Sequence, residues 1–147
     1  MIQLIDDQLL GAVLRGDRPP RPRAQVFTTG YWYVRLCQAV LSASNRTGVL
    51  SAPFAALPTE ARARATRRLL ELPESIGLVS LRDLAPLIGE LRQRHDLNIL
   101  AIEALAACVH LEADVYLSAP SPRLQLAVNE EEQLRQTIDD QVPRETS

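Results

Sequence analysis

The chain has 147 residues, of which 46% are hydrophobic and 23% are charged, and its formal net charge is −2. These values are ordinary for a soluble globular protein, and the length suits one domain with a real core. No apolar run reaches the roughly 18–20 residues that a membrane span requires, and no basic segment precedes an apolar one at the N-terminus, so we expect a cytoplasmic protein.

The first part of the chain predicts two strands, each followed by a helix. Strands are expected at 2–5 and 26–28, and helices at 8–14 and within TTGYWYVRLCQAVLSAS, where Trp32, Leu36 and Val40 recur at helical spacing. The intervening RGDRPPRPRA holds three prolines and four Arg, which indicates a loop.

The middle of the chain predicts two more helices around a third strand. In LPTEARARATRRLLELP, Thr59 is the expected N-cap and Pro73 the stop. A strand is expected at 77–79, and Ser80 opens the helix in LRDLAPLIGELRQRH. Pro86 fits that helix only if the helix begins late or bends there.

The last part begins with the longest periodic stretch, LNILAIEALAACVHLEA, which predicts a helix. A strand at 114–118 follows, then a turn at PSPR because of its two prolines, and LQLAV is a plausible last strand. Asn129 is the expected cap of a final helix in EEEQLRQTI. We expect a single domain over 1–138 and a disordered tail over 139–147.

Strands that alternate with helices predict the fold class. We expect a three-layer α/β/α sandwich with a central, mainly parallel sheet of four to five strands. Ligands of such sheets bind at the carboxyl ends of the strands. Asp6 and Asp7 lie at that edge, as does the end of the strand at 114–118.

The order of elements resembles a PIN domain, the fold of the VapC toxin ribonucleases. The resemblance rests on LIDDQLLGAVL, VFTTGYWYVRLCQAVL and LNILAIEALAACVHLEADVYLSA, and it extends to about residue 119. It implies a toxin–antitoxin setting, a homodimer and a protein partner such as an antitoxin. It also implies three or four carboxylates that hold Mg²⁺ or Mn²⁺, which would activate water and stabilise charge on a phosphate.

Only the first of these carboxylates is present in the expected place. Asp6, with Asp7 beside it, matches the first acid, but the second falls at Arg35. The third falls at Ala101 or Asn98. At the fourth, SAPSPR offers Ser118 and Ser121 but no acid, and its prolines argue against the helix that PIN domains usually have there.

Two interpretations of the acidic residues follow. In the first, the metal site is degenerate, no cofactor is bound, and Asp6 and Asp7 form a strand terminus with an Asx turn or helix cap. In the second, the chain is an active Mg/Mn-dependent ribonuclease, with Asp6 catalytic and with Asp6, Asp7 and Glu103 as ligands. Glu103 lies two residues from Ala101, about 200° around the helix axis, so it should point elsewhere. Asp96 is the other acid near the third position.

Basic and acidic residues are unevenly distributed. Residues 1–70 hold ten Arg against four acids, a balance of +6, whereas residues 71–147 hold six Arg against fourteen acids, a balance of −8. The two halves could neutralise each other in the fold, or form a basic face for phosphates and an acidic face for a partner. The candidate nucleic-acid contacts are Arg64, Arg67 and Arg68, which share a helix face, with Arg21 and Arg23 from the proline-rich loop.

Two further features bear on function. Tyr31, Trp32 and Tyr33 could stack on bases, although Trp32 at helical spacing also suits the core. Cys37 and Cys108 stand in apolar helical contexts, which favours buried small side chains over a disulfide or zinc site. The sequence therefore predicts a PIN-like protein that binds RNA or a protein partner, with the active ribonuclease and an interaction module without nucleic acid as alternatives.

Overall fold

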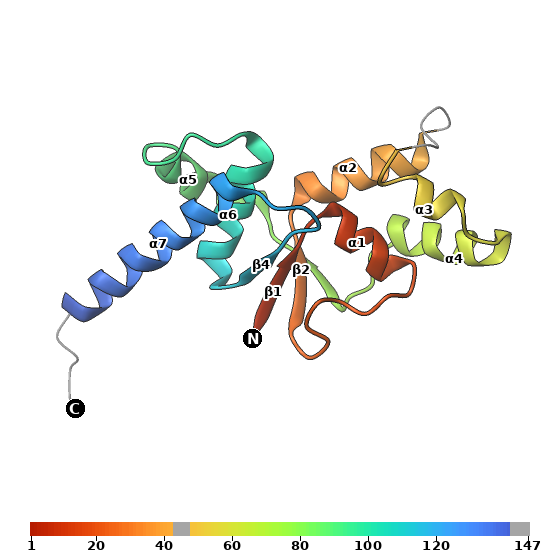
Figure 1. The fold of residues 1–147 in the computed structure, drawn as a ribbon, viewed down its shortest axis with the longest axis horizontal. Coiled ribbons are helices and arrows are strands. Elements are labelled where there is room, and N and C mark those ends of the chain that lie inside the picture. Colours follow the sequence, from red (N-terminus) through yellow and green to blue (C-terminus); the bar gives the residue numbers. More distant parts are fainter. Residues whose placement is uncertain (43–47, 142–147) are drawn as a thin grey trace.

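The computed structural model describes residues 1–42 and 48–141 (Figure 1). At its centre is a parallel sheet of four short strands in the order β3-β2-β1-β4. The strands are β1 (Ile2–Ile5), β2 (Gln25–Thr28), β3 (Ile76–Leu78) and β4 (Asp114–Tyr116). Helices cover both faces, so the predicted α/β/α sandwich with a central parallel sheet is confirmed.

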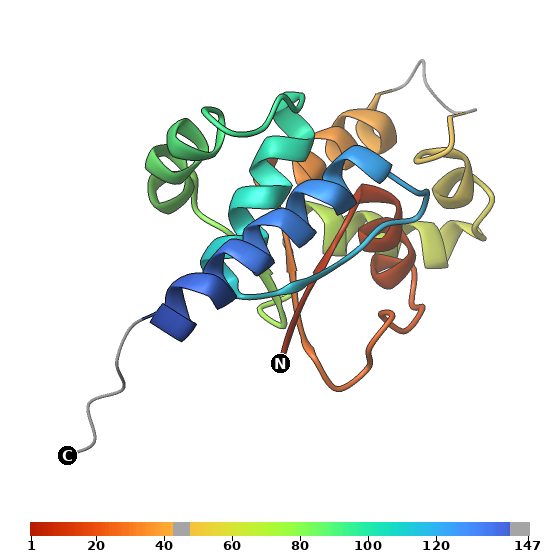
Figure 2. The same cartoon turned by 60° about the vertical axis from the view of Figure 1, so that its left-hand side comes forward.

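Seven helices connect or follow the strands in the described ranges. They are α1 (Asp7–Leu14), α2 (Gly30–Leu41), α3 (Ala52–Ala55), α4 (Thr59–Leu70), α5 (Leu81–Leu91), α6 (Ile99–Leu111) and α7 (Pro122–Gln141). Figures 1 and 2 show α1–α4 on one side of the sheet and α5–α7 on the other. We call these the first and second helical layers.

The alternation of side chains along β1 divides the core between the layers. Leu4 packs with α5, α6 and α7 residues in one buried cluster, and Ile5 packs with α1, α2, α3 and α4 residues in another. Cys108 is buried in the α6 cluster, and burial raises the pKa of its thiol to about 12. The prediction that it is a buried small side chain is confirmed.

The β2–β3 pairing depends on a glycine. Phe27 pairs with Gly77, and a Cβ atom at Gly77 would lie 2.6 Å from Cδ1 of the Phe27 ring. Carbon atoms pack no closer than about 3.5 Å, so any larger residue here would push the ring away.

Side-chain caps begin four of the helices, and the sequence suggests those of Asp6 and Ser80. Asp6, Thr29, Ser80 and Asn98 each accept a hydrogen bond from a backbone N–H in the first turn of α1, α2, α5 and α6. Thr59, the expected cap of α4, is instead its first residue and follows Pro58, which provides no cap, and Ser51 before α3 makes no side-chain cap bond either.

Pro86 lies inside α5, which begins at Leu81 rather than later in the segment. The proline is exposed, so its ring faces solvent and not the core.

The C-terminal region differs most from the sequence-based prediction. LQLAV is not a strand but part of α7, and Asn129 is not a cap but an interior residue that accepts a hydrogen bond from Gln125. Pro122 begins the helix, where its missing N–H costs nothing. Leu124 and Ala127 are buried at helical spacing, and the burial of this face decides the structure.

α7 continues to Gln141, beyond the expected domain end at 138, and the tail over 142–147 lies outside the described residues. β4 ends at Tyr116, two residues before the expected end. Across the described ranges, we find no helix with the length and apolar character needed to cross a membrane.

Candidate functional site

Asp6 lies at the carboxyl edge of the sheet, between β1 and α1. Its Oδ1 accepts a hydrogen bond from the Leu9 N–H at 2.9 Å, which caps α1. Its Oδ2 accepts two bonds from Ser118, at 2.7 Å from the backbone N–H and 2.6 Å from the hydroxyl. Both carboxylate oxygens are therefore engaged by donors of the protein, and the predicted helix-cap role is confirmed.

Ser118 belongs to this site, although the sequence did not predict its contact with Asp6. β1 pairs with β4 in parallel, with Ile5 opposite Tyr116, so the chain after each strand emerges at the same edge. Ser118 thereby stands where the resemblance placed a fourth acid, and it donates to Asp6 instead of joining it as a ligand. The pairing of the first and last strands was the only signal that could have predicted this contact.

Asp7 is 7% exposed and lies beside Arg35 of α2. Its Oδ2 is 3.2 Å from Arg35 Nη1, and its Oδ1 accepts a hydrogen bond from the Gln8 N–H at 2.8 Å. The Arg35 contact is an ion pair without hydrogen-bond alignment, because Oδ2 has no hydrogen-bonding partner in the described protein. Burial raises the pKa of Asp7, while Arg35 acts to lower it and Asp6 to raise it further.

Glu103 of α6 is fully buried at the start of α2. Its Oε1 accepts a hydrogen bond from the Tyr31 N–H at 2.9 Å, where the helix dipole favours a negative charge. Its Oε2 has no hydrogen-bond partner among the described residues. This oxygen lies close to Gly30, because a Cβ atom added to that glycine would be 3.6 Å from it. Glu103 thus interacts with the first turn of α2.

The other candidates for the third acid do not add a carboxylate. Asn98 caps α6 through the Ala101 N–H at 2.9 Å, Ala101 is half-buried, and Asp96 is exposed. The described part of the chain contains no group of three His, Cys, Asp or Glu residues placed to hold a metal ion. Each acid at this edge already has a partner in the protein: Asp6 contacts Ser118, Asp7 contacts Arg35 and Glu103 contacts Tyr31. A cation here would therefore compete with the Arg35 guanidinium, with the N–H and hydroxyl of Ser118 and with the Tyr31 N–H.

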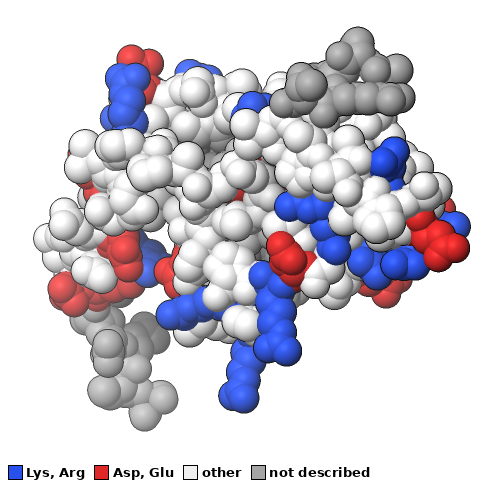
Figure 3. Space-filling view, turned by 45° about the vertical axis from the view of Figure 1, so that its right-hand side comes forward, with Lys and Arg blue, Asp and Glu red and all other residues white. Residues whose placement is uncertain are grey.

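The candidate nucleic-acid residues lie in the first helical layer. Arg64, Arg67 and Arg68 are exposed on α4, opposite the buried Ala65 and Leu69. Arg68 Nη1 donates to the Leu14 carbonyl at 3.2 Å, at the end of α1. The loop that carries the remaining two candidates continues from this point, and Figure 3 shows Arg side chains gathered on this side of the molecule.

Gln3 holds that loop against the sheet. Its fully buried side chain donates to the carbonyls of Arg21 and Ala24, and it accepts a hydrogen bond from the Arg21 N–H at 3.0 Å. The side chains of Arg21 and Arg23 remain exposed. We call these two residues together with Arg64, Arg67 and Arg68 the basic face.

Among residues 1–42 and 48–141, no ion pair connects the two halves of the chain. Asp7–Arg35 lies within residues 1–70, and the pairs Arg94–Glu90, Arg94–Glu131, His95–Glu130, His95–Glu131 and Arg135–Glu112 all lie within residues 71–141. Within the described ranges, Arg35 is the only arginine of the first half that pairs with a carboxylate. The described parts of the two halves therefore do not neutralise each other through direct pairs.

The aromatic candidates separate into core and surface. Trp32 is 6% exposed and belongs to the core, and the Tyr33 hydroxyl donates to the Leu69 carbonyl at 2.7 Å. Tyr31 is 40% exposed and is the one of the three whose ring could meet a ligand.

No protein-family model matches this sequence, and no curated protein matches it. Function is therefore inferred from the residues themselves.

Proposed function

We propose that this protein is a cytoplasmic, PIN-like domain that has lost its metal site and binds RNA through the basic face. The observation that carries the proposal is the state of Asp6: the one acid that matches the PIN pattern already accepts three hydrogen bonds from the protein. Mg²⁺ binds oxygen atoms with free lone pairs in a near-octahedral arrangement. Three of the roughly four lone-pair sites of this carboxylate are therefore already occupied, so a metal ion here would compete with the α1 cap and the Ser118 bonds.

Arg35 supports the same conclusion. Its guanidinium lies 3.2 Å from the carboxylate of Asp7, so a positive charge already compensates the second acid at this edge. A divalent cation would be repelled by this arginine unless the side chain swung away. The residues present therefore do not fit a catalytic metal, and we derive no cleavage step from them.

The basic face supports RNA binding. Its arginines are exposed and, in the described structure, none of them pairs with a carboxylate. Arginine binds phosphate oxygens in a bidentate manner, and each phosphate neutralised releases counterions. A chain of net charge −2 that keeps these cations unpaired on one side is suited to a polyanion on that side alone.

Binding to a labelled single-stranded RNA, measured by fluorescence anisotropy in EDTA over a salt series, tests this proposal. Arg64 and Arg67 are the residues to replace. Neither side chain makes a hydrogen bond or ion pair with the described residues, so their replacement should not disturb folding. We expect Arg64→Gln with Arg67→Gln to weaken binding about tenfold or more and to lower the salt slope by about 1.4, as two lost phosphate contacts require.

The matched control replaces Arg82 and Arg123, two exposed arginines of the second layer whose side chains also make no such contact. This control removes the same charge and should leave affinity unchanged. Equal weakening by both double variants would show that only net charge matters. Absence of RNA binding in the wild-type protein would overturn the proposal.

An active ribonuclease is the second candidate function. Two buried carboxylate oxygens, Asp7 Oδ2 and Glu103 Oε2, have no hydrogen-bond partner among the described residues, and such atoms often bind an ion or water. Incubation of the same RNA with Mn²⁺ distinguishes the two functions. Cleavage that stops with EDTA and is lost in Asp6→Ala would establish the ribonuclease; we expect none.

A further inference from the structure

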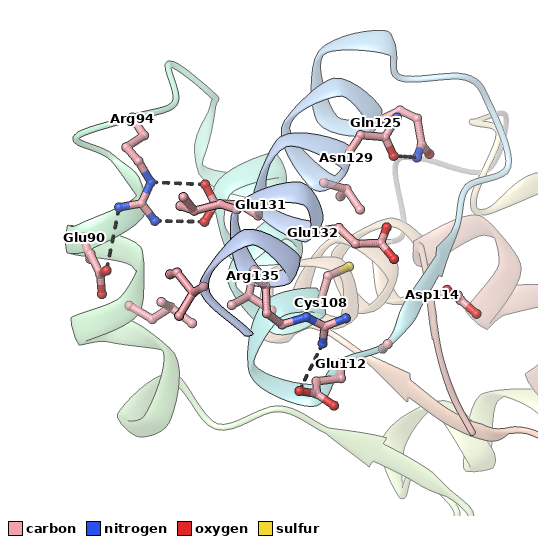
Figure 4. A pocket seen from close by; sticks show the side chains of 16 residues that line it. Glu90, Arg94, Cys108, Glu112, Asp114, Gln125, Asn129, Glu131, Glu132 and Arg135 are labelled. Atoms are coloured by element: carbon pink, nitrogen blue, oxygen red, sulfur yellow. Dashed lines mark hydrogen bonds and ion pairs between the residues drawn. The ribbon is translucent and has the colours of Figure 1, made fainter. Parts of the chain in front are cut away.

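A groove runs along α7 on the second helical layer, at the opposite side of the sheet from the basic face. It has a volume of about 370 Å³ and is lined by α5, the C-terminal end of α6 and most of α7 (Figure 4). The lining on α7 extends from Gln125 to Ile138, which corresponds to about 20 Å of helix at 1.5 Å per residue. This length equals three to four turns of a second helix laid beside it.

The groove has an apolar floor that remains partly open to solvent. Leu134 is 43% exposed, Ile138 is 52% exposed and Val109 of α6 is 36% exposed. Leu87 and Val128 complete the apolar lining. The end of α7 extends away from the rest of the domain, as Figure 2 shows, and the two apolar side chains of this end stay about half exposed.

The rim of the groove is acidic. Five carboxylates line it against two arginines, and both arginines are already paired: Arg94 with Glu131 at 2.8 Å, and Arg135 with Glu112 at 3.0 Å. Glu132 and Asp114 form no ion pair within the described residues, and Figure 4 shows both beside the groove. A ligand of this groove should therefore combine apolar side chains with positive charges.

We infer that the groove binds an amphipathic, basic helix of a partner protein. Apolar side chains at i, i+3/i+4 and i+7 of that helix lie on the apolar floor, and Lys or Arg residues beside this stripe face Glu132 and Asp114. A second copy of this chain is a poorer occupant through α7, because that helix carries five acidic residues against two arginines and would lie against an acidic rim. This surface is separate from the basic face and does not depend on RNA binding.

Two synthetic helical peptides of equal length provide the test. Both carry the same leucine stripe; one carries Arg and the other Glu beside it. Binding of each labelled peptide to the full chain is measured by anisotropy at physiological salt. We expect the Arg peptide to bind at least tenfold more tightly than the Glu peptide, and Glu132→Arg to reduce this difference.

Variants of α7 locate the site. Leu134→Ser with Ile138→Ser should weaken the Arg peptide at least tenfold, because these residues form the floor. Leu126→Ser is the matched control: Leu126 is 60% exposed on the same helix but does not line the groove. Similar peptide affinities, or an equal effect of the control, would overturn the inference.

The size of the protein in solution, measured by light scattering, tests the alternative occupant. If the wild-type chain is a dimer that Leu134→Ser with Ile138→Ser dissociates, the groove holds a second copy and the inference is wrong. Arg64→Gln with Arg67→Gln should leave peptide binding unchanged, so that failure of the RNA proposal and failure of this one are distinguishable.

Discussion

The two helical layers use their charged residues in opposite ways. In the first layer, arginines contact neutral groups: Arg62 and Arg68 donate to backbone carbonyls, and Arg15 lies over the Phe54 ring at 5.3 Å from its centroid. In the second layer, Arg94 and Arg135 pair with carboxylates. Within the described ranges, the first layer has one arginine–carboxylate pair, Asp7–Arg35, whereas the pairs of Arg94 and Arg135 in the second layer join separate helical segments.

This difference separates stability from binding. Ion pairs in the second layer connect elements, because Arg94 and His95 follow α5 and Glu131 belongs to α7. Uncompensated cations in the first layer stabilise the fold little, and they create a positive potential that attracts anionic ligands. Removal of a paired charge of the second layer should therefore affect folding, whereas removal of an unpaired arginine of the first layer should affect ligand binding.

The largest expected effect is at Glu131. Its side chain is 9% exposed, and it accepts two hydrogen bonds from Arg94 at 2.8 and 3.1 Å and lies 2.6 Å from His95 Nε2. Glu131→Gln removes the charge that these groups share, and we expect a loss of about 2 kcal/mol in the free energy of unfolding. Urea denaturation measures this loss.

The control for Glu131 is its neighbour. Glu132→Gln changes an exposed residue without an ion pair in the described chain, and its effect should stay within about 0.5 kcal/mol. Equal effects of the two variants would show that the second layer does not depend on this network.

The next largest effect is the loss of the Glu131 contribution to folding stability at acidic pH. The hydrogen bonds from Arg94 hold the pKa of Glu131 below its ordinary value of 4.5; His95 adds to this effect and burial opposes it. Because the folded-state pKa is depressed, the stabilisation is present above about pH 4.5 and is lost as the pH falls through the folded-state pKa. The unfolding free energies of wild type and Glu131→Gln should converge in that range. Parallel curves down to low pH would contradict this origin.

The sequence was sufficient for the architecture in most places. Alternating strands and helices required a covered parallel sheet, and Asp6 and Ser80 fixed helix starts through local hydrogen bonds. α7 was predicted wrongly because Pro122 suggested a turn and LQLAV is short and apolar. Only its packing on α6, a contact between separate elements, determines that this segment is helical.

The surroundings of Asp6 and Asp7 were less predictable, because they too depend on contacts between separate elements. The resemblance to PIN domains implied that Arg35 stands where a second acid is expected, and the structure places it beside Asp7. The contact of Ser118 with Asp6 joins residues 112 positions apart and depends on the pairing of β1 with β4. Sequence periodicity contains no information on that pairing.

Asp7 is an exception within the first layer and should show a smaller effect of opposite sign. Its pKa is raised, mainly by burial, so its ionised form is less favourable in the folded state than in the unfolded chain. Stability associated with this group is therefore present below about pH 3.8 and is lost as the pH rises through the folded-state pKa.

Asp7→Asn should increase the free energy of unfolding at pH 7 by less than about 1 kcal/mol, because the exposed Arg35 provides only a weak pair. Thermal unfolding at pH 7 and pH 3 measures the change, which should disappear at the lower pH. A destabilised variant at pH 7 would show that the Asp7–Arg35 pair contributes to folding, as the pairs of the second layer do.

The smallest effect on stability is expected at Arg67, and it tests the comparison most directly. This exposed side chain of α4 forms no ion pair in the described structure, so Arg67→Gln should change the free energy of unfolding by less than about 0.5 kcal/mol. The same substitution should weaken RNA binding and lower the salt slope by about 0.7, as one lost phosphate contact requires. Urea denaturation and anisotropy on one protein preparation measure both quantities. A variant that loses stability without losing RNA affinity would place Arg67 with Glu131 among the residues that hold the fold, and the separation of roles between the layers would then be wrong.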